Sequence, residues 1–220
     1  MTGKSVRTAL LNRQITVGSW IQIGHPAVAE ILSEVGFEWI AIDCEHADID
    51  IRGFTEVIRG LHGRGPIALA RVRENDTLAI RQVLDAGAGG VIVPLVDTAE
   101  EARKAVISAK YPPEGLRGFA FCRANNWGQD FDEYCQQAND GVAVIAMVET
   151  RQAVDNIDEI LAVEGLDGVF VGPYDMSGSY GVTGQTSHPL VRDACSRVVE
   201  ACRQHQKAAG IHLVNPSGET

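Results

Sequence analysis

Seven short apolar runs recur along the chain, and they constrain its fold more than any other feature does. Each run is almost uninterrupted, whereas a half-buried strand alternates apolar and polar residues. The pattern is therefore typical of parallel strands that are covered on both faces. Strands are predicted at residues 17–23, 39–44, 67–72, 89–96, 142–149, 167–173 and 209–214.

Amphipathic segments separate these runs and are predicted to be helices. The first places Ile31, Leu32 and Val35 on one face and ends at Gly36, which is a common helix stop. Asp76 is a candidate N-cap for the second. The predicted helices span residues 26–36, 76–87, 97–110, 150–163 and 188–206. Alternation of strands and helices predicts an α/β fold.

The number of strand–helix units favours a (β/α)8 barrel, a TIM barrel, over a doubly wound sheet. No predicted strand is followed by a Gly-x-Gly-x-x-Gly or a Gly-x-x-x-x-Gly-Lys-[Ser/Thr] loop, which weakens the nucleotide-binding alternative. The chain ends six residues after the seventh strand. We therefore expect a barrel that lacks its C-terminal strand and helix, or one completed in another way, with residues 118–122 as a short candidate for an additional strand.

No shift in composition marks a domain boundary, so residues 1–220 are expected to form a single domain. The connection 111–141 is long and rich in proline, glycine, asparagine and aromatic residues. Long connections in compact domains are usually functional. We therefore expect this one to be an active-site or interface loop.

Composition argues against several classes of partner. The formal net charge of -10 disfavours nonspecific binding to nucleic acid, which requires a cationic surface. An anionic substrate stays possible at a local arginine or metal. No apolar window is long enough for a membrane span, and residues 1–14 lack the apolar stretch of a signal peptide. The five cysteines form no Cys-x-x-Cys pair, which favours a reducing, cytoplasmic location over a disulfide framework.

Polar residues follow nearly every predicted strand, at the end where chemistry collects in βα barrels. Among them, Glu149 and Asp175 are candidate metal ligands. Two carboxylates together with waters and substrate oxygens make the oxygen-rich site that Mg2+ or Mn2+ prefers. The alternative is a surface acid at a helix N-terminus. That alternative is weaker for Asp175, because small residues around it let backbone N–H groups approach a ligand.

His46 and Arg71 are the other candidates at the strand ends. His46 lies close to Asp43 and Glu45, and a neighbouring carboxylate can orient an imidazole for acid–base work. A structural histidine is the alternative. Arg71 ends an apolar strand, where it could pair with Asp43 or hold an enolate or carboxylate oxygen. These two roles are compatible.

Taken together, the motifs resemble the HpcH/HpaI family of metal-dependent class II pyruvate aldolases, which act on 2-keto-3-deoxy sugar acids and related hydroxy-oxo acids. The matching stretches follow the family's order over nearly the whole chain. They are GSWIQIGHPAVAEILSEVGFEWIAIDCEH, ARVREND, LDAGAGGVIVPLVDTAEEA, YPPEGLRG, VET and GLDGVFVGPYDMSGSYG.

The resemblance implies a role for each matching residue. Glu149 and Asp175 would bind a divalent metal ion, Mg2+, Mn2+ or Co2+. Arg71 would stabilise the pyruvate enolate. His46 would be the acid–base residue, with Asp85 supporting it across a subunit boundary.

For substrate binding, the resemblance implies a pocket that contains Trp20 and Asp43. The substrate carboxylate would bind the backbone at Pro173, Tyr174 and Asp175. The family fold is a (β/α)8 barrel, and the expected assembly is a homo-oligomer, a hexamer built from trimers. Neither a nucleic acid nor a membrane is expected as a partner.

Two features depart from the family pattern. Met147 stands where many members have a glutamine that contacts the pyruvate moiety, and a thioether cannot replace the hydrogen bonds of an amide. The chain also ends before the family's eighth strand and last helix, which affects the expected barrel closure and assembly.

The expected reaction is the reversible cleavage of a 4-hydroxy-2-oxo acid to pyruvate and an aldehyde, through a metal-stabilised pyruvate enolate. Lys4, Lys104, Lys110 and Lys207 lie in polar or helical contexts, which argues against a Schiff-base aldolase. The alternatives are oxaloacetate decarboxylation or CoA-ester lyase chemistry at the same site, and a non-catalytic truncated fragment.

Overall fold

A single parallel sheet organises the computed structural model, which describes residues 6–213. The strands follow one another in chain order and each pairs with the next. They are β1 (Gly18–Ile21), β2 (Trp39–Asp43), β3 (Ile67–Arg71), β4 (Gly90–Val93), β5 (Ala143–Val148), β6 (Gly168–Val171) and β7 (Ala208–Ile211). The α/β fold with a parallel sheet is therefore confirmed.

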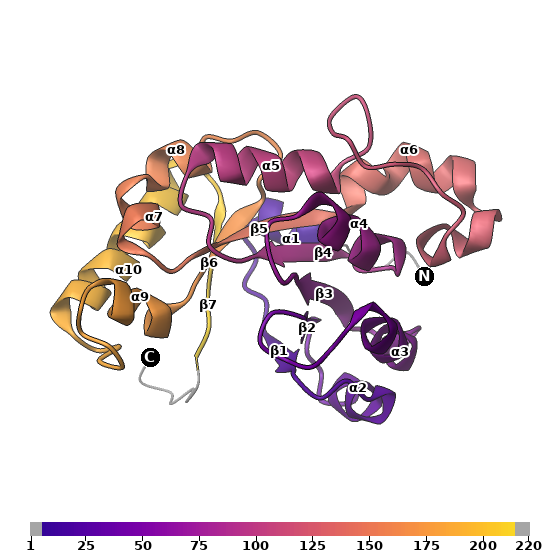
Figure 1. Cartoon of the computed structure of the whole chain (residues 1–220), viewed down its shortest axis with the longest axis horizontal. Coiled ribbons are helices and arrows are strands. Elements are labelled where there is room, and N and C mark those ends of the chain that lie inside the picture. Colours follow the sequence, from indigo (N-terminus) through magenta and orange to yellow (C-terminus); the bar gives the residue numbers. More distant parts are fainter. Residues whose placement is uncertain (1–5, 214–220) are drawn as a thin grey trace.

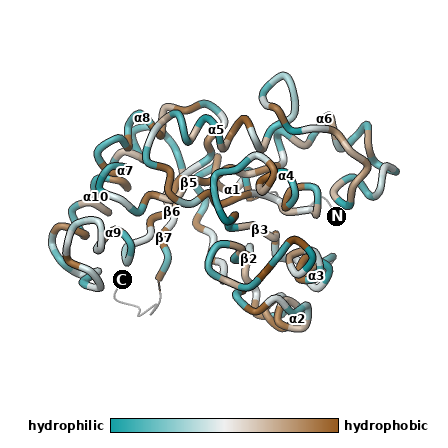
Figure 2. Tube along the Cα trace, in the orientation of Figure 1, coloured by the Kyte–Doolittle hydropathy of each residue, from teal (hydrophilic) through white to brown (hydrophobic). Residues whose placement is uncertain are grey.

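Beyond β1, helices connect the strands and lie around the outside of the curled sheet (Figure 1), whereas α1 (Val6–Leu11) precedes β1 and packs against the inner core. Figure 2 shows that they alternate between hydrophilic and hydrophobic residues along their length, as expected for helices with one face on a sheet. Asp76 caps α4 (Thr77–Asp85) as predicted, accepting hydrogen bonds from the N–H groups of Leu78 and Ala79. The helices are α1 (Val6–Leu11), α2 (Pro26–Ser33), α3 (Ile51–Leu61), α4 (Thr77–Asp85), α5 (Ala99–Ala109), α6 (Phe131–Gly141), α7 (Arg151–Asp155), α8 (Ile157–Leu161), α9 (Pro173–Ser179) and α10 (Pro189–Gln204), with a 3-10 segment η1 (Arg123–Gly128).

Alternation along the strands creates two apolar cores, because successive side chains point to opposite faces. Ala41, Leu69, Ile92 and Phe170 point into the curl and form the inner core. Their outward neighbours pack against the helices in the larger outer core. Val6 from α1 joins the inner core. The same alternation brings inward-facing residues at the strand ends to one rim.

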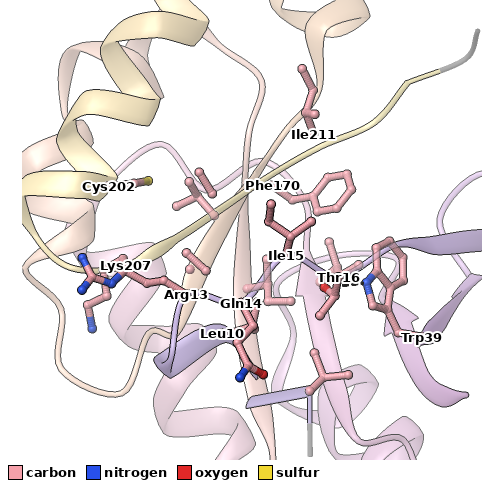
Figure 3. Close-up of a pocket in the computed structure, with 18 of the residues that line it drawn as sticks. Leu10, Arg13, Gln14, Ile15, Thr16, Trp39, Phe170, Cys202, Lys207 and Ile211 are labelled. Atoms are coloured by element: carbon pink, nitrogen blue, oxygen red, sulfur yellow. Dashed lines mark hydrogen bonds between the residues drawn. The ribbon is translucent and has the colours of Figure 1, made fainter. Parts of the chain in front are cut away.

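The sheet curls but does not close within the described residues. There, β1 pairs with β2 and β7 pairs with β6, and no ladder joins β1 to β7. A cavity of about 710 Å³ lies beside β7, with Leu10, Ile15 and Phe170 among its lining residues (Figure 3). The structure is thus an open, half-barrel-like curl. Residues 214–220, on which the expectation of a truncated end rests, lie outside the described residues.

Three local predictions are corrected by the structure. Residues 118–122 are not a strand: Phe119 stacks on Tyr111 with ring centroids 4.5 Å apart, and the carbonyl of Ala120 accepts from Asn125, so this segment is held by local contacts. The helix predicted at 150–163 divides at Asn156, whose side chain donates to the Asp97 carbonyl.

The third correction concerns the strand predicted at 89–96. It stops at Val93, and Leu95 takes a left-handed conformation with φ 51°, which ends the extended backbone. The helices α1, α3 and α6 were not predicted. Among the described residues, no helix has the length and hydropathy to cross a bilayer. All five cysteines are free thiols.

Candidate active site

A buried ion pair joins the ends of β2 and β3. Asp43 and Arg71 are register partners in the sheet and both point into the curl. The Arg71 Nε donates to Asp43 Oδ1 over 2.9 Å, and Nη2 donates to Oδ2 over 2.5 Å. Two parallel bonds of this kind fix the guanidinium plane as well as its charge. Of the two roles predicted for Arg71, the pairing with Asp43 is confirmed.

Asp43 accepts hydrogen bonds from four residues. Besides Arg71, the donors are the Gln22 side chain and the backbone N–H groups of Glu45 and His46. Burial alone would raise the pKa of Asp43, but the hydrogen bonds from Arg71, Gln22 and the backbone hold it below the usual value. Asp43 is therefore ionised at neutral pH and fixes the turn that follows β2.

Glu45 has a buried oxygen that is not satisfied. Its Oε2 lies 3.3 Å from the Arg71 Nε and 3.6 Å from the His46 Nε2, yet it has no hydrogen-bond partner among the described residues. Burial raises the pKa of Glu45, and the charges of Asp43 and Asp175 raise it further, whereas those of Arg71 and His46 lower it. An added cation or donor would stabilise this carboxylate.

Glu149 brings a second buried carboxylate to the same rim, directly after β5. Its Oε1 accepts from the Leu95 N–H over 2.9 Å, which the left-handed conformation of Leu95 directs toward it. Burial raises the pKa of Glu149, and the charges of Glu45 and Asp175 act in the same direction. Gly172 leaves room for this side chain: a Cβ there would lie 3.2 Å from Glu149 Oε2.

Asp175 lies in the first turn of α9 and is exposed. Pro173 begins that helix, so its backbone offers no N–H. Tyr174 is 60% exposed, and its carbonyl accepts from the Ser177 hydroxyl. The charge of Asp175 raises the pKa values of both Glu45 and Glu149, so the three acids share one electrostatic environment.

His46 faces outward at this rim. Its side chain is 60% exposed and its Nε2 is 3.6 Å from Glu45 Oε2. The backbone of His46 is held by Asp43, so the ring can reach a substrate while its main chain stays fixed. An acid–base role for His46 stays a prediction.

Trp20 completes this side of the site. The Arg71 Cζ lies 4.8 Å from the Trp20 ring centroid, and the rings of Phe170 and His212 also contact Trp20. His212 was missed by the sequence analysis. It follows β7 directly, so the same strand-end rule that selected Arg71 and Glu149 would have found it.

The last two predicted site residues differ in how near they lie to this rim. Met147 Cε and Glu149 Oε2 both lie beside Gly172, 3.7 and 3.2 Å from the position of a Cβ there. Met147 is buried in the inner core, where it is the register partner of Phe170. Asp85 ends α4, which runs back from the rim, and it accepts from Arg117 Nη2 over 2.8 Å. This chain therefore does not bring Asp85 to its own His46, and the role across a subunit boundary stays a prediction.

The acids at the rim fit a divalent cation bound through few protein ligands. Among residues 6–213, no three histidine, cysteine or acidic side chains meet closely enough to hold a metal alone. Asp43, Glu45, Glu149 and Asp175 nevertheless outnumber the one guanidinium of Arg71, and two of these carboxylates have raised pKa values. Mg2+ and Mn2+ commonly use one or two carboxylates, with water and substrate oxygens filling the remaining positions.

Comparisons with known proteins identify the family of the chain. The model of the HpcH/HpaI aldolase/citrate lyase family matches residues 16–216. The chain is 37% identical over 205 residues to a 5-keto-4-deoxy-D-glucarate aldolase of Shigella sonnei, which covers 93% of this chain and 80% of that protein.

Solved structures show the same relationship. A family protein from Burkholderia cenocepacia superposes with a TM-score of 0.92 at 33% identity, covering 97% of this chain and 86% of that one. An HpcH/HpaI aldolase from Desulfitobacterium hafniense superposes with a TM-score of 0.90 at 30% identity, covering 98% of this chain and 84% of that one. The chain belongs to the HpcH/HpaI aldolase/citrate lyase family.

Proposed function

We propose that this aldolase-type lyase reversibly cleaves a 4-hydroxy-2-oxo acid to pyruvate and an aldehyde. The observation that carries the proposal is the Asp43–Arg71 pair. Its guanidinium is fixed in a bidentate geometry beside buried acids with raised pKa values. A fixed cation at this position can stabilise the oxyanion of an enolate without reorganising during the reaction.

The chain's own residues account for the proton and electron movements of the cleavage. His46, or a water that it holds, accepts the proton of the substrate's 4-hydroxyl. The C3–C4 bond then breaks, the aldehyde carbonyl forms, and the electron pair passes to the C2 oxygen of the pyruvate enolate, beside Arg71. The proton then passes from His46, or from the water that it holds, to C3 and gives pyruvate. Aldol addition reverses the sequence.

Glu149 and Asp175 are the proposed metal ligands, and the surplus of acids at the rim supports this assignment. A divalent ion there would supply a Lewis acid for the 2-oxo group. The substrate carboxylate is assigned to the N–H groups of Tyr174 and Asp175, since Pro173 has none. Met147 offers no amide for the pyruvate moiety, so we expect shape and the charges at the rim to hold it.

The preferred substrate is proposed from the relatives. Because the similar curated proteins are named as 5-keto-4-deoxy-D-glucarate aldolases, that oxo acid is the first candidate. We further propose that the working molecule is a closed (β/α)8 barrel within a homo-hexamer. The placement of Asp85 away from His46 within this chain supports an assembly in which a neighbouring subunit contributes to the site.

A coupled assay of pyruvate release across a panel of 4-hydroxy-2-oxo acids tests the proposal. We expect turnover with Mg2+, Mn2+ or Co2+, loss of turnover after chelation by EDTA, and recovery when metal is returned. Treatment with borohydride and pyruvate should leave the enzyme active, because no lysine forms a Schiff base. Activity that survives complete metal removal would contradict the proposal.

A further inference from the structure

His212 makes a contact across the open side of the sheet. It directly follows β7, and its ring stacks on Trp20 of β1 with centroids 5.2 Å apart and an interplanar angle of 28°. In the described part of the chain, no backbone ladder joins β1 to β7. The two rings therefore connect, at the rim of the site, strands that the sheet leaves apart.

Trp20 contacts Arg71 as well as His212. The Arg71 Cζ lies 4.8 Å from the Trp20 ring centroid, a distance at which the ring face attracts a guanidinium. The rings of Phe170 and Trp20 meet edge to face, with centroids 5.7 Å apart and an interplanar angle of 78°. The indole is thus held by contacts from β3, β6 and the end of β7, and its orientation is coupled to that of the guanidinium.

We propose that His212 holds the Trp20 ring against the Arg71 guanidinium and thereby positions Arg71 for the enolate oxygen. His212 is a positioning residue in this account, because it acts through Trp20. The role rests on the proposed function of Arg71. The stack itself is independent of that function, so the two can be tested separately.

The charges around His212 give the stack a pH dependence. The groups that act on it are Arg71 from β3 and Asp43 from β2. Partial burial lowers the pKa of His212, Arg71 lowers it further, and Asp43 raises it. The ring is therefore neutral at pH 7, and acid converts it to a second cation close to Arg71. Stacking should weaken as the pH falls through the His212 pKa.

Two substitutions separate stacking from the chemistry of the imidazole. His212→Ala removes the ring, whereas His212→Phe keeps a flat ring without nitrogens. The assay is deuterium exchange of the pyruvate methyl protons, which needs enolate formation but no aldehyde. We expect kcat/KM to fall about three- to tenfold in His212→Ala, the worth of one aromatic pair, and His212→Phe to restore most of that loss. His205→Ala, a control at the end of α10 where His205 pairs with Asp158, should change it less than twofold.

A readout without pyruvate tests the stack. Protein labelled with 5-fluorotryptophan has three fluorine resonances, one for each tryptophan, and Trp20→Phe identifies the one from Trp20. In the wild type, this resonance should titrate with His212 below pH 7. In His212→Phe the same titration should be absent. As the pH is lowered, the rate of deuterium exchange into pyruvate should also fall less in His212→Phe than in the wild type.

Each outcome decides the proposal. Equal losses in His212→Ala and His212→Phe would show that the imidazole nitrogens contact the reactant, which overturns a positioning role. No loss in either variant, or a Trp20 resonance unaffected by His212, would overturn it as well. Wild-type protein that does not exchange pyruvate would contradict the proposed function and the positioning of Arg71 with it, while the fluorine titration would still decide whether the stack exists.

Discussion

Two arginine–aspartate pairs in this molecule have a buried guanidinium and nearly the same chemistry, but very different surroundings. Arg71 pairs with Asp43 and lies over Trp20. Arg117 pairs with Asp85, with Tyr111 at 4.5 Å and Tyr134 at 5.8 Å from its Cζ. Each guanidinium is thus hydrogen-bonded to one aspartate and has aromatic neighbours, and Arg71 has a second carboxylate, that of Glu45, within ion-pair distance.

The difference lies in what surrounds each pair. Around Arg71 there are further acids, and burial raises the pKa values of Glu45 and Glu149. Around Arg117 the described neighbours are mainly tyrosines, and burial raises the pKa values of Tyr111 and Tyr134, which keeps them neutral. A charge-balanced pair holds structure together, whereas a surplus of buried negative charge is relieved by protonation or by an added cation. That surplus, rather than the ion pair, distinguishes the active site.

The largest expected effects come from exchanging each arginine for lysine, which keeps the charge and loses the bidentate geometry. Arg71→Lys should lower kcat/KM for pyruvate release about 100-fold or more. Arg117→Lys should chiefly lower stability, with the folded fraction keeping most of its turnover. Steady-state kinetics and denaturant unfolding on both variants check this. If Arg117→Lys loses as much turnover as Arg71→Lys, the Arg117 guanidinium takes part in catalysis and the contrast fails.

Removing one surplus charge should cost activity without costing stability. In Glu149→Gln the amide oxygen can still accept from the Leu95 N–H, while a buried charge with a raised pKa is gone. We expect kcat/KM to fall about 100-fold and Tm to stay equal or rise. Calorimetry beside the kinetic assay gives both numbers. A marked fall in Tm would mean that Glu149 is structural.

Lys110 lies close to Arg117, and the pH dependence of its contribution to stability tests the claim that this region is structural. It is 1% exposed and donates to the carbonyls of Asn139 and Val142, and burial lowers its pKa from 10.5 to about 8. Between those values the unfolded chain binds more protons than the folded one, so stability gains with rising pH. Relative to Lys110→Met, the wild type should gain on the order of 3 kcal/mol from pH 8 to 10.5. Urea unfolding at several pH values measures this. A difference in unfolding free energy between the wild type and Lys110→Met that does not change with pH would refute the prediction.

The smallest expected effect concerns the space that Glu149 occupies. In Gly172→Ala, the new Cβ would lie 3.2 Å from Glu149 Oε2 and 3.3 Å from its Cβ, so the carboxylate must move by a few tenths of an ångström. Misplacement on this scale should lower kcat/KM roughly tenfold. The matched control is Gly178→Ala, where Thr183 Oγ1 is 3.8 Å away. Equal kinetics in the two variants would show that the position of Glu149 is not critical.

The sequence predicted the parallel strands and the acids at their ends because both follow from local pattern. Continuous apolar runs mark covered strands, and register partners at adjacent strand ends, such as Asp43 and Arg71, meet without further information. The helix α3 was missed because Gly53 and Gly60 weaken its pattern. Gly60 lets α3 approach α2, since a Cβ there would lie 2.6 Å from the Pro26 carbonyl oxygen.

Other features depend on contacts that no local pattern encodes. The stack of His212 on Trp20 joins residues almost 200 positions apart. The left-handed Leu95 donates its N–H to Glu149, far along the chain. The segment 118–122 has an apolar composition but satisfies its groups locally. Tertiary contacts decide each of these cases.

The most direct test of the Arg71 site is deuterium exchange of the pyruvate methyl protons, followed by proton NMR with and without a divalent metal ion. Wild-type protein should exchange the protons only when Mg2+, Mn2+ or Co2+ is present. Arg71→Lys should be at least about 100-fold slower, and Arg117→Lys should stay close to the wild type. Exchange that is equally fast in Arg71→Lys, or absent from the metal-loaded wild type, would contradict the assignment of enolate chemistry to the charged rim.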